Sequence, residues 1–294
     1  MDGILIIRKE KGYTSHDVVA KLRGILHMKK IGHTGTLDPE AEGVLPVALG
    51  KATKLVEMLT EKEKTYEAVL HLGIETDTQD MTGTVLDRKD VCVTEEAVRK
   101  AIRSFLGDQM QIPPMYSALK VGGKKLYELA RAGMEIEREA RPVHFSAIDI
   151  LEIDLPLVRF SVTCSKGTYI RTLCHDIGKA LGCGGCMENL VRTRSGRFSI
   201  EESFTLAQVQ EAADEGTVPE IVVSIEEILS EYPRVQCTPE GDRLLYNGNS
   251  LHEGLVPCIS PKGQVRMCTS EGQFVGIYRW NSGGKKYAPV KMFL

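Results

Sequence analysis

The sequence predicts an α+β fold, with a large domain built on a mixed, largely antiparallel sheet and a small β-rich domain after it. Segments typical of strands and helices are interspersed with hairpin-like alternation, and the regular strand–helix order of a parallel sheet is missing. Near Tyr232 the chain changes to short apolar runs and glycine-rich turns. Its 294 residues suffice for a domain over residues 1–231 and another over residues 232–294.

The first third of the chain predicts a strand, a helix, a loop and a second strand. The run GILIIRK predicts an opening strand, and Thr14 or Ser15 is a candidate N-cap for the helix that follows. A glycine-containing loop comes next, and then a short helix around residues 51–59. In KTYEAVLHLGI, strict alternation places five side chains on one face of a strand: Tyr66, Ala68, Leu70, Leu72 and Ile74.

The middle of the chain predicts a helix and then an irregular insertion. Thr94 is a candidate N-cap, and Gly107 is a candidate end for that helix. The stretch QIPPMYSALKVGGKK is rich in proline and glycine and indicates a loop, which a short helix extends to Gly133. We expect this insertion, at about residues 112–142, to lie over an active site.

The second half predicts further strands at residues 143–153 and 158–164. The segment SKGTYIRTLCHDIGKALG then indicates a strand end that leads into a helix capped by Gly182. A strand over residues 190–200 and two helical segments over residues 205–230 complete the large domain.

Charge is distributed unevenly, although the net charge is only −3. Residues 159–197 contain seven Lys and Arg against two acids, whereas residues 198–233 contain nine acids and no Lys or Arg. An acidic protein can therefore carry a basic face of the kind that nucleic-acid binding requires. Ordinary solvated surface charge is the alternative interpretation.

Cysteine usage and hydropathy favour a cytoplasmic protein. The eight cysteines are scattered, which is not the pattern of a disulfide scaffold, so we expect reduced thiols. No run of about 18 apolar residues is present, and the first residues lack the order of a signal peptide.

Several common site types do not fit. GVLPVALGKAT has the wrong glycine spacing for a phosphate-binding loop, and Ala52 stands where a magnesium-binding hydroxyl is needed. Cys183 and Cys186 lack a second cysteine pair, which disfavours structural zinc. Neither a G-x-S-x-G elbow nor a dinucleotide fingerprint occurs, which disfavours a hydrolase or a dehydrogenase.

Asp38 is the remaining candidate for chemistry. In GHTGTLDP, Gly32 and Gly35 allow tight turns or a close approach to a ligand, and Pro39 stiffens the exit of the loop. The carboxylate is thus held on a shaped loop. By pattern alone, Asp38 serves equally well as a simple turn cap.

Residues 32–54, GHTGTLDPEAEGVLPVALGKATK, resemble the signature of the bacterial pseudouridine 55 synthases, the TruB family. Further matches occur in the family's order over nearly all of residues 1–200: KGYTSHDVV, KTYEAVLHLG, TDTQDMTG, IPPMYSALKVGGKKLYELAR, CSKGTYIRTLCHDIG and NLVRTRSGRF. The resemblance implies a pseudouridine-synthase catalytic domain, and the end of the chain resembles a PUA-like RNA-binding domain.

The resemblance implies that the protein isomerises uridine 55 in the T loop of tRNA by base flipping, without a cofactor. Asp38 matches the family's catalytic aspartate, and Arg171 matches the arginine that pairs with it and favours its ionised form. Tyr66 matches the tyrosine that stacks on the base and is a candidate for proton transfer. Glu42 stands where relatives carry Thr or Ser, and we expect it to point away from Asp38.

Further residues match family positions for substrate binding: His33, Tyr169, Leu190, Lys54, Ser15 and His16. His33 corresponds to the histidine that fills the space left by the flipped base, and Leu190 to an apolar residue beside the base. Ser15 and His16 are expected to contact phosphate or sugar. The expected partner is the T stem-loop of tRNA, bound by a monomer with no obligate protein partner.

Two alternatives remain beside this reading. One is a tRNA-binding or tRNA-folding protein whose catalysis is secondary, because flipping and refolding a loop do not require Asp38. The other is the guide-RNA-dependent relative that modifies ribosomal RNA within a complex. The insertion and the absence of long basic tails disfavour the second alternative.

Overall fold

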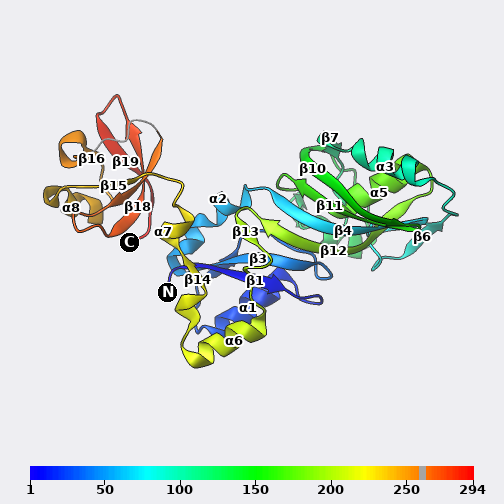
Figure 1. Ribbon diagram of the computed structural model, residues 1–294, viewed down its shortest axis with the longest axis horizontal. Coiled ribbons are helices and arrows are strands. Elements are labelled where there is room, and N and C mark those ends of the chain that lie inside the picture. The colour runs from blue at the N-terminus through cyan, green and yellow to red at the C-terminus, as the bar shows by residue number, and fades with distance from the viewer. Residues whose placement is uncertain (258–262) are drawn as a thin grey trace.

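The computed structural model describes residues 1–257 and 263–294, and Cys258 is among the residues outside this description. A ten-stranded sheet forms the centre of the molecule (Figure 1). Along it lie β14 (Val222–Ser224), β1 (Gly3–Lys9), β3 (Glu42–Leu49), β12 (Gly185–Ser195), β4 (Lys64–Leu72), β11 (Leu157–Cys164), β10 (Arg141–Asp154) and β7 (Gly107–Gln111). Within the described ranges, no helix is long and apolar enough to cross a membrane.

The sheet confirms the predicted fold class. Two short strands join it from the side, β2 (Ile31–His33) on β3 and β13 (Phe198–Ser199) on β12. Its strand pairs are antiparallel except for β3 and β12, which run parallel through Val191–Glu42 and Arg192–Gly43. The sheet is therefore mixed and largely antiparallel.

Residues 4–7 of strand β1 are all apolar because both faces of the strand are covered there. Ile4 and Ile6 join one core cluster, while Leu5 and Ile7 join the cluster on the other face, beneath α1 (Ser15–Ile25) and α6 (Leu206–Glu215). Strand β4 alternates as predicted up to Leu72, and Tyr66, Ala68, Leu70 and Leu72 enter one core cluster. That cluster packs under α3 (Glu95–Arg103) and α5 (Ile170–Leu181). The prediction for Ile74 was wrong, because β4 ends at Leu72 and Ile74 begins the separate strand β5 (Ile74–Thr76).

The helix ends follow the predicted caps in three places. The side chain of Thr14 accepts a hydrogen bond from Asp17 N in a capping box, and that of Thr94 accepts one from Ala97 N. Gly182 ends α5 with a φ of 77°. The prediction for Gly107 was wrong, because α3 ends at Arg103 and Gly107 begins the edge strand β7.

Two other segments differ from the prediction. Strand β12 begins at Gly185, earlier than the predicted start at residue 190, and it ends at Ser195 before the short β13. The stretch 205–230 contains η2 (Val218–Glu220), β14 and α7 (Ile225–Ile228) after α6. Strand β14 pairs with β1 and has only three residues. A segment this short is too small to show an alternating pattern, so the sequence did not predict it.

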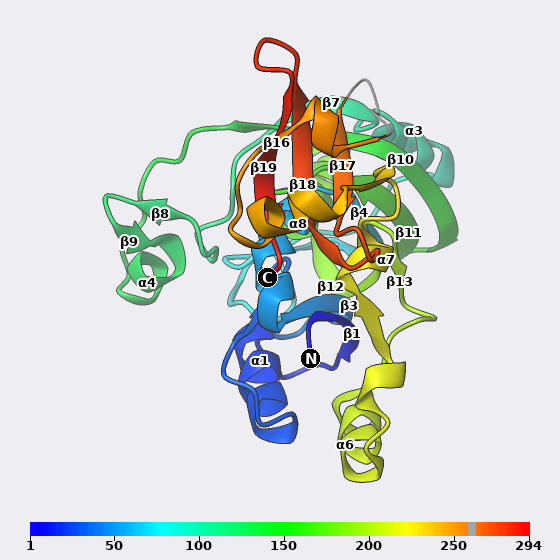
Figure 2. The same ribbon diagram turned by 90° about the vertical axis from the view of Figure 1, so that its left-hand side faces the viewer.

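The remaining short elements of the large domain flank the sheet. After β3 come η1 (Gly50–Leu55) and α2 (Val56–Thr60), and a separate hairpin pairs β5 (Ile74–Thr76) with β6 (Val85–Arg88). The predicted insertion contains β8 (Lys120–Val121), β9 (Lys124–Lys125) and α4 (Leu126–Arg131), which project as an arm in Figure 2.

The C-terminal region carries its own five-stranded sheet, in the order β15 (Arg234–Gln236), β17 (Gln264–Cys268), β18 (Phe274–Asn281), β19 (Lys286–Met292) and β16 (Leu251–His252). It also contains α8 (Pro239–Tyr246) and η3 (Glu253–Leu255). Ile277 and Phe293 pack into the core cluster shared with β1 and η1. The β-rich C-terminal region is thus docked on the large sheet (Figure 1).

Candidate active site

The loop that carries Asp38 is held at several points. Ser15, the first residue of α1, is buried, and its Oγ accepts a hydrogen bond from Leu37 N at 2.9 Å. Lys9 Nζ donates to the carbonyl of Pro39 at 3.0 Å. Ala41 N donates to the carbonyl of Asp38 at 3.1 Å, which closes a turn with the backbone of Asp38 and leaves its carboxylate for another partner.

Arg192 holds the backbone on either side of Asp38 through hydrogen bonds to carbonyl groups. Its guanidinium is fully buried and donates to three carbonyls: Val44 at 2.7 Å, Gly35 at 3.2 Å and Thr36 at 3.5 Å. Strand β12 reaches this position only because Gly43 faces it, since a Cβ on Gly43, with its φ of 108°, would lie 2.2 Å from the Arg192 carbonyl oxygen. The parallel contact between β3 and β12 thus shapes the Asp38 loop.

The partner of the Asp38 carboxylate is Arg171, in the first turn of α5. Arg171 Nε lies 3.0 Å from Asp38 Oδ2, and Nη1 lies 3.4 Å from Asp80 Oδ2. The other donors reach the carbonyls of Thr78, at 3.1 Å, and Tyr116, at 2.9 Å. The Arg171 side chain is 5% exposed and that of Asp38 is 38% exposed, so a buried cation supports a partly buried carboxylate.

Burial raises the pKa of Asp38 above its usual range, and Arg171 acts against this shift. The charge of Asp80 raises the pKa of Asp38 further, while Lys9 lowers it. Arg171 therefore favours the ionised form, as expected, but burial has the larger effect. The like charge that raises the pKa of Asp38 is that of Asp80, while the charge of Glu42 raises the pKa of Lys9.

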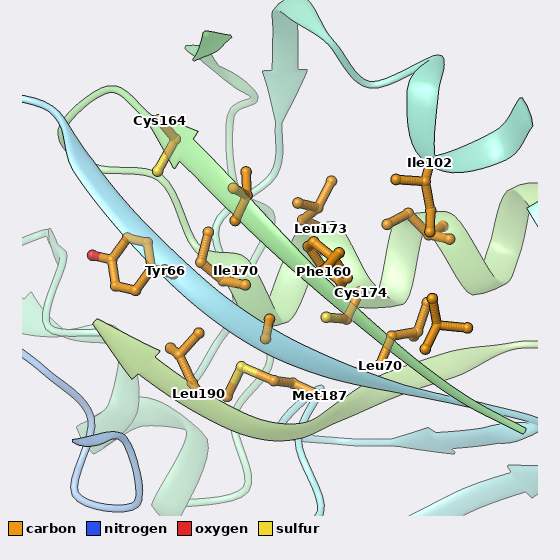
Figure 3. Close-up of a cluster of buried hydrophobic side chains, with 14 of the residues drawn as sticks. Tyr66, Leu70, Ile102, Phe160, Cys164, Ile170, Leu173, Cys174, Met187 and Leu190 are labelled. Atoms are coloured by element: carbon orange, nitrogen blue, oxygen red, sulfur yellow. The ribbon is translucent and has the colours of Figure 1, made fainter. Parts of the chain in front are cut away.

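Tyr66 and Leu190 lie beside the Asp38 loop, in the core cluster that also contains Leu37. They come from the adjacent strands β4 and β12, with Ile170 of α5 next to Tyr66 (Figure 3). Both side chains are largely buried, and burial raises the pKa of the Tyr66 hydroxyl. The structure therefore brings these two residues together with Asp38 and Arg171 and keeps Tyr66 a neutral phenol.

His16 and His33 lie next to each other. Their rings meet edge to face with centroids 5.3 Å apart, and His33 Nδ1 accepts from Gly35 N at 3.4 Å. Burial lowers the pKa of His33, and the charge of His16 and of Arg192 lowers it further. A neutral His33 with its Nε2–H free for a ligand is the resulting form.

The other predicted site residues divide into three positions. Tyr169 is half-buried at the start of α5, immediately before the segment that carries Arg171. Ser15 is buried under the Asp38 loop, as described above. Lys54 lies at the junction with the C-terminal sheet, where its Nζ donates to the carbonyl of Met292 at 2.7 Å and Lys291 Nζ donates back to the Lys54 carbonyl.

Most cations of residues 159–197 make ion pairs or are buried. Four of the seven cations make ion pairs, Arg159 with Glu67, Lys166 with Glu61, Arg197 with Glu227, and Arg171 with Asp38 and Asp80. Arg192 is buried on carbonyl groups. Two of these cations, Arg171 and Arg192, help to build the site, while Arg159, Lys166 and Arg197 pair at the exposed surface.

Sequence reasoning missed four residues that shape the site: Asp80, Tyr116, Lys9 and Arg192. Asp80 and Tyr116 stand in TDTQDMTG and IPPMYSALK, two motifs that indicate the family but assign no role to either residue. Lys9 ends an apolar strand and is fully buried, a placement that itself signals a specific partner. Among the described residues, no group of three His, Cys, Asp or Glu is placed to hold a metal ion, Cys183 and Cys186 included.

Family models match most of the chain. The model described as TruB family pseudouridylate synthase (N terminal domain) matches residues 23–170. A second model, described as tRNA pseudouridylate synthase B C-terminal domain, matches residues 171–230. The curated tRNA pseudouridine synthase B of Lachnoclostridium phytofermentans is 50% identical, with 100% of both chains covered. That of Clostridium novyi is 46% identical over 97% of this chain and 98% of its own.

Solved structures give the same result for the fold. A chain in a structure of an H/ACA RNP bound to a substrate RNA containing 2′-deoxyuridine superimposes with a TM-score of 0.72 at 28% identity. A chain in a Cbf5-Nop10-Gar1 complex superimposes with a TM-score of 0.73 at 29% identity. Each comparison covers 99% of this chain and 85% of the other.

Proposed function

The chain belongs to the TruB family of pseudouridylate synthases, and from this premise we propose that it isomerises uridine to pseudouridine in tRNA, at position 55 of the T loop. The observation that carries the proposal is the Asp38–Arg171 pair at 3.0 Å, in which an accessible carboxylate rests on a buried guanidinium. Asp38 and Arg171 fall within the motifs that carried the family resemblance.

The reaction breaks the N1–C1′ bond, turns the uracil and rejoins it to C1′ through C5. Two routes use the Asp38 carboxylate as a nucleophile, with attack at C1′ or at C6, and a third uses it to support elimination to a glycal. In each route the C5 proton leaves and N1 gains a proton, so atoms and electrons balance without a cofactor. A hydrogen released from C5 therefore reports completed isomerisation.

Tyr66 and Leu190 are proposed to hold the extruded base. Their positions beside the Asp38 loop give an aromatic ring and an apolar side chain for its two faces. The raised pKa of Tyr66 favours its neutral hydroxyl, which suits stacking and hydrogen bonding near neutral pH.

His33, His16 and Tyr169 are proposed to contact the substrate around the base. The neutral His33 ring, supported by His16, fits the role of filling the gap left by the flipped uridine. The positions of Ser15 and Lys54 give them different tasks in this proposal. Ser15 holds the Asp38 loop, and Lys54 joins the large sheet to the C-terminal sheet, whose PUA-like, RNA-binding character is also proposed.

The guide-dependent alternative has support from the solved structures, which are an H/ACA RNP with a substrate RNA and a Cbf5-Nop10-Gar1 complex. Curated relatives at 46–50% identity over full length are tRNA pseudouridine synthase B, which favours direct action on tRNA. We propose a cytoplasmic monomer that needs no protein partner. Activity of the isolated protein on bare tRNA separates the two functions.

The proposal is tested with a T stem-loop RNA tritiated at uridine C5, incubated with the purified protein in EDTA and without added cofactor. We expect tritium release to the solvent and a single pseudouridine at position 55 by nuclease mapping. RNA binding without tritium release would favour the tRNA-folding alternative. Release that appears only when a guide RNA is added would favour the guide-dependent function.

The pH profile tests the electrostatics of the site. Burial lowers the pKa of Lys9 to about 8, so near neutral pH most of its charge is present and lowers the pKa of Asp38. Replacing it in Lys9→Met removes this charge, and the pKa of Asp38 rises further. Because the reaction needs the ionised carboxylate, we expect the acid limb of kcat/KM to move to higher pH by about half a unit or more.

The matched control for this prediction is Lys11→Met, which removes an exposed lysine two positions along the chain. We expect its acid limb to coincide with that of the wild type. Equal profiles for Lys9→Met and the wild type would show that Asp38 does not depend on the Lys9 charge.

A further inference from the structure

Helix α5 begins without an ordinary cap, although it carries the arginine that pairs with Asp38. Its N-cap residue is Tyr169, whose side chain makes no capping hydrogen bond. Ser, Thr, Asp or Asn usually fixes this position. The first turn, which carries the buried Arg171, is therefore positioned by another part of the chain.

The side chain of Gln111 supplies the missing support. Its Oε1 accepts from Tyr169 N at 2.8 Å, and its Nε2 donates to Tyr169 O at 3.0 Å. Tyr169 O also accepts the first helical bond of α5, from Leu173 N at 3.2 Å. The primary amide thus pairs with both backbone groups of one residue, as a neighbouring strand would, and only 4% of Gln111 is exposed.

The same stretch of chain also holds Arg171 itself. Tyr116, five positions after Gln111, accepts from Arg171 Nη2 at 2.9 Å through its carbonyl. Pro113, Pro114 and Met115 between them are buried. Residues 111–117 are therefore the packed root of the insertion, while β8, β9 and α4 beyond them extend away from the large sheet (Figure 2).

We propose that Gln111 is a positioning residue for the isomerisation, through which the root of the insertion holds Arg171 against Asp38. The amide fixes the backbone of Tyr169, and the Arg171 side chain two residues later then reaches Asp38, Asp80, Thr78 and Tyr116 together. The inference rests on the proposed function, because its effect is on the rate of that reaction. It assigns Gln111 no contact with the substrate.

The first test is Gln111→Met, which keeps the size of the side chain and removes both hydrogen bonds. We expect the single-turnover rate on the T stem-loop to fall on the order of tenfold or more, because small displacements of a catalytic pair cost large factors in rate. The Kd for the RNA should change by less than about threefold. Gln109→Met is the matched control, since Gln109 lies on the same strand and donates only to the Ser104 carbonyl.

The second variant, Gln111→Glu, separates positioning from general damage to the fold. An ionised glutamate at this place sets a carboxylate oxygen against the Tyr169 carbonyl, whereas the protonated acid restores the donor. Burial raises the pKa of such an acid, so it protonates within an accessible range. We expect the rate relative to wild type to recover at least about threefold between pH 8 and pH 5.5, while the relative rate of Gln111→Met stays flat.

The outcomes are distinct. A Gln111→Met rate within about twofold of the wild type, or a loss equal to that of Gln109→Met, overturns the inference and leaves the proposed function intact. A pH-independent loss in Gln111→Glu also overturns it. Absence of tritium release by the wild-type protein itself is the failure of the proposed function.

Discussion

Replacing Asp38 by Asn is expected to abolish tritium release, with a loss of at least about 10⁴-fold in the single-turnover rate. The amide keeps the shape of the side chain, but it cannot attack carbon or stabilise positive charge at C1′. The backbone of the loop should persist, because Ser15 and Lys9 hold it through the residues on either side of Asp38. The Kd for the T stem-loop should therefore stay within a few-fold of the wild type.

Glu42→Gln is the matched control for Asp38→Asn. It removes one negative charge at the start of β3, four positions from Asp38. We expect its rate to stay within about threefold of the wild type, since the carboxylate whose charge raises the pKa of Asp38 is that of Asp80. A rate in Asp38→Asn within about tenfold of the wild type would show that another group performs the proposed chemistry.

Arg171→Lys is expected to reduce both activity and stability. A lysine keeps the charge but cannot meet four groups at once, so the carbonyls of Thr78 and Tyr116 compete with the two carboxylates for one ammonium. We expect the single-turnover rate to fall on the order of 10²-fold or more and the free energy of unfolding to fall by about 2–3 kcal/mol. Urea denaturation with the tritium assay measures both.

Arg159→Lys is the corresponding control, because the Arg159 side chain is exposed and pairs only at the surface with Glu67. We expect its free energy of unfolding to change by less than about 0.5 kcal/mol. If Arg171→Lys matched this control in stability and in rate, the ion pair and the hydrogen bonds of the buried guanidinium would not be what positions Asp38.

Local sequence patterns predicted β4 and the ends of two helices, but they did not predict β14. Alternation in residues 64–72 predicted the buried face of β4, because one face of that strand covers the core and the other does not. Thr14 and Gly182 predicted helix ends because capping is a local interaction. Strand β14 was missed because three residues become a strand only when β1 offers them an edge.

The sequence by itself determined the family and the fold class, since these depend on motifs and local periodicity, and the family motif predicts Asp38 as the central carboxylate. Only the tertiary structure decided the contacts of Arg171 and Arg192. Pattern alone makes Arg171 a solvated helix arginine and Arg192 part of a basic face, yet both are buried on partners more than 50 positions away. Burial and long-range pairing turn such charges into supports for Asp38, and neither quantity is encoded in the spacing of neighbouring residues.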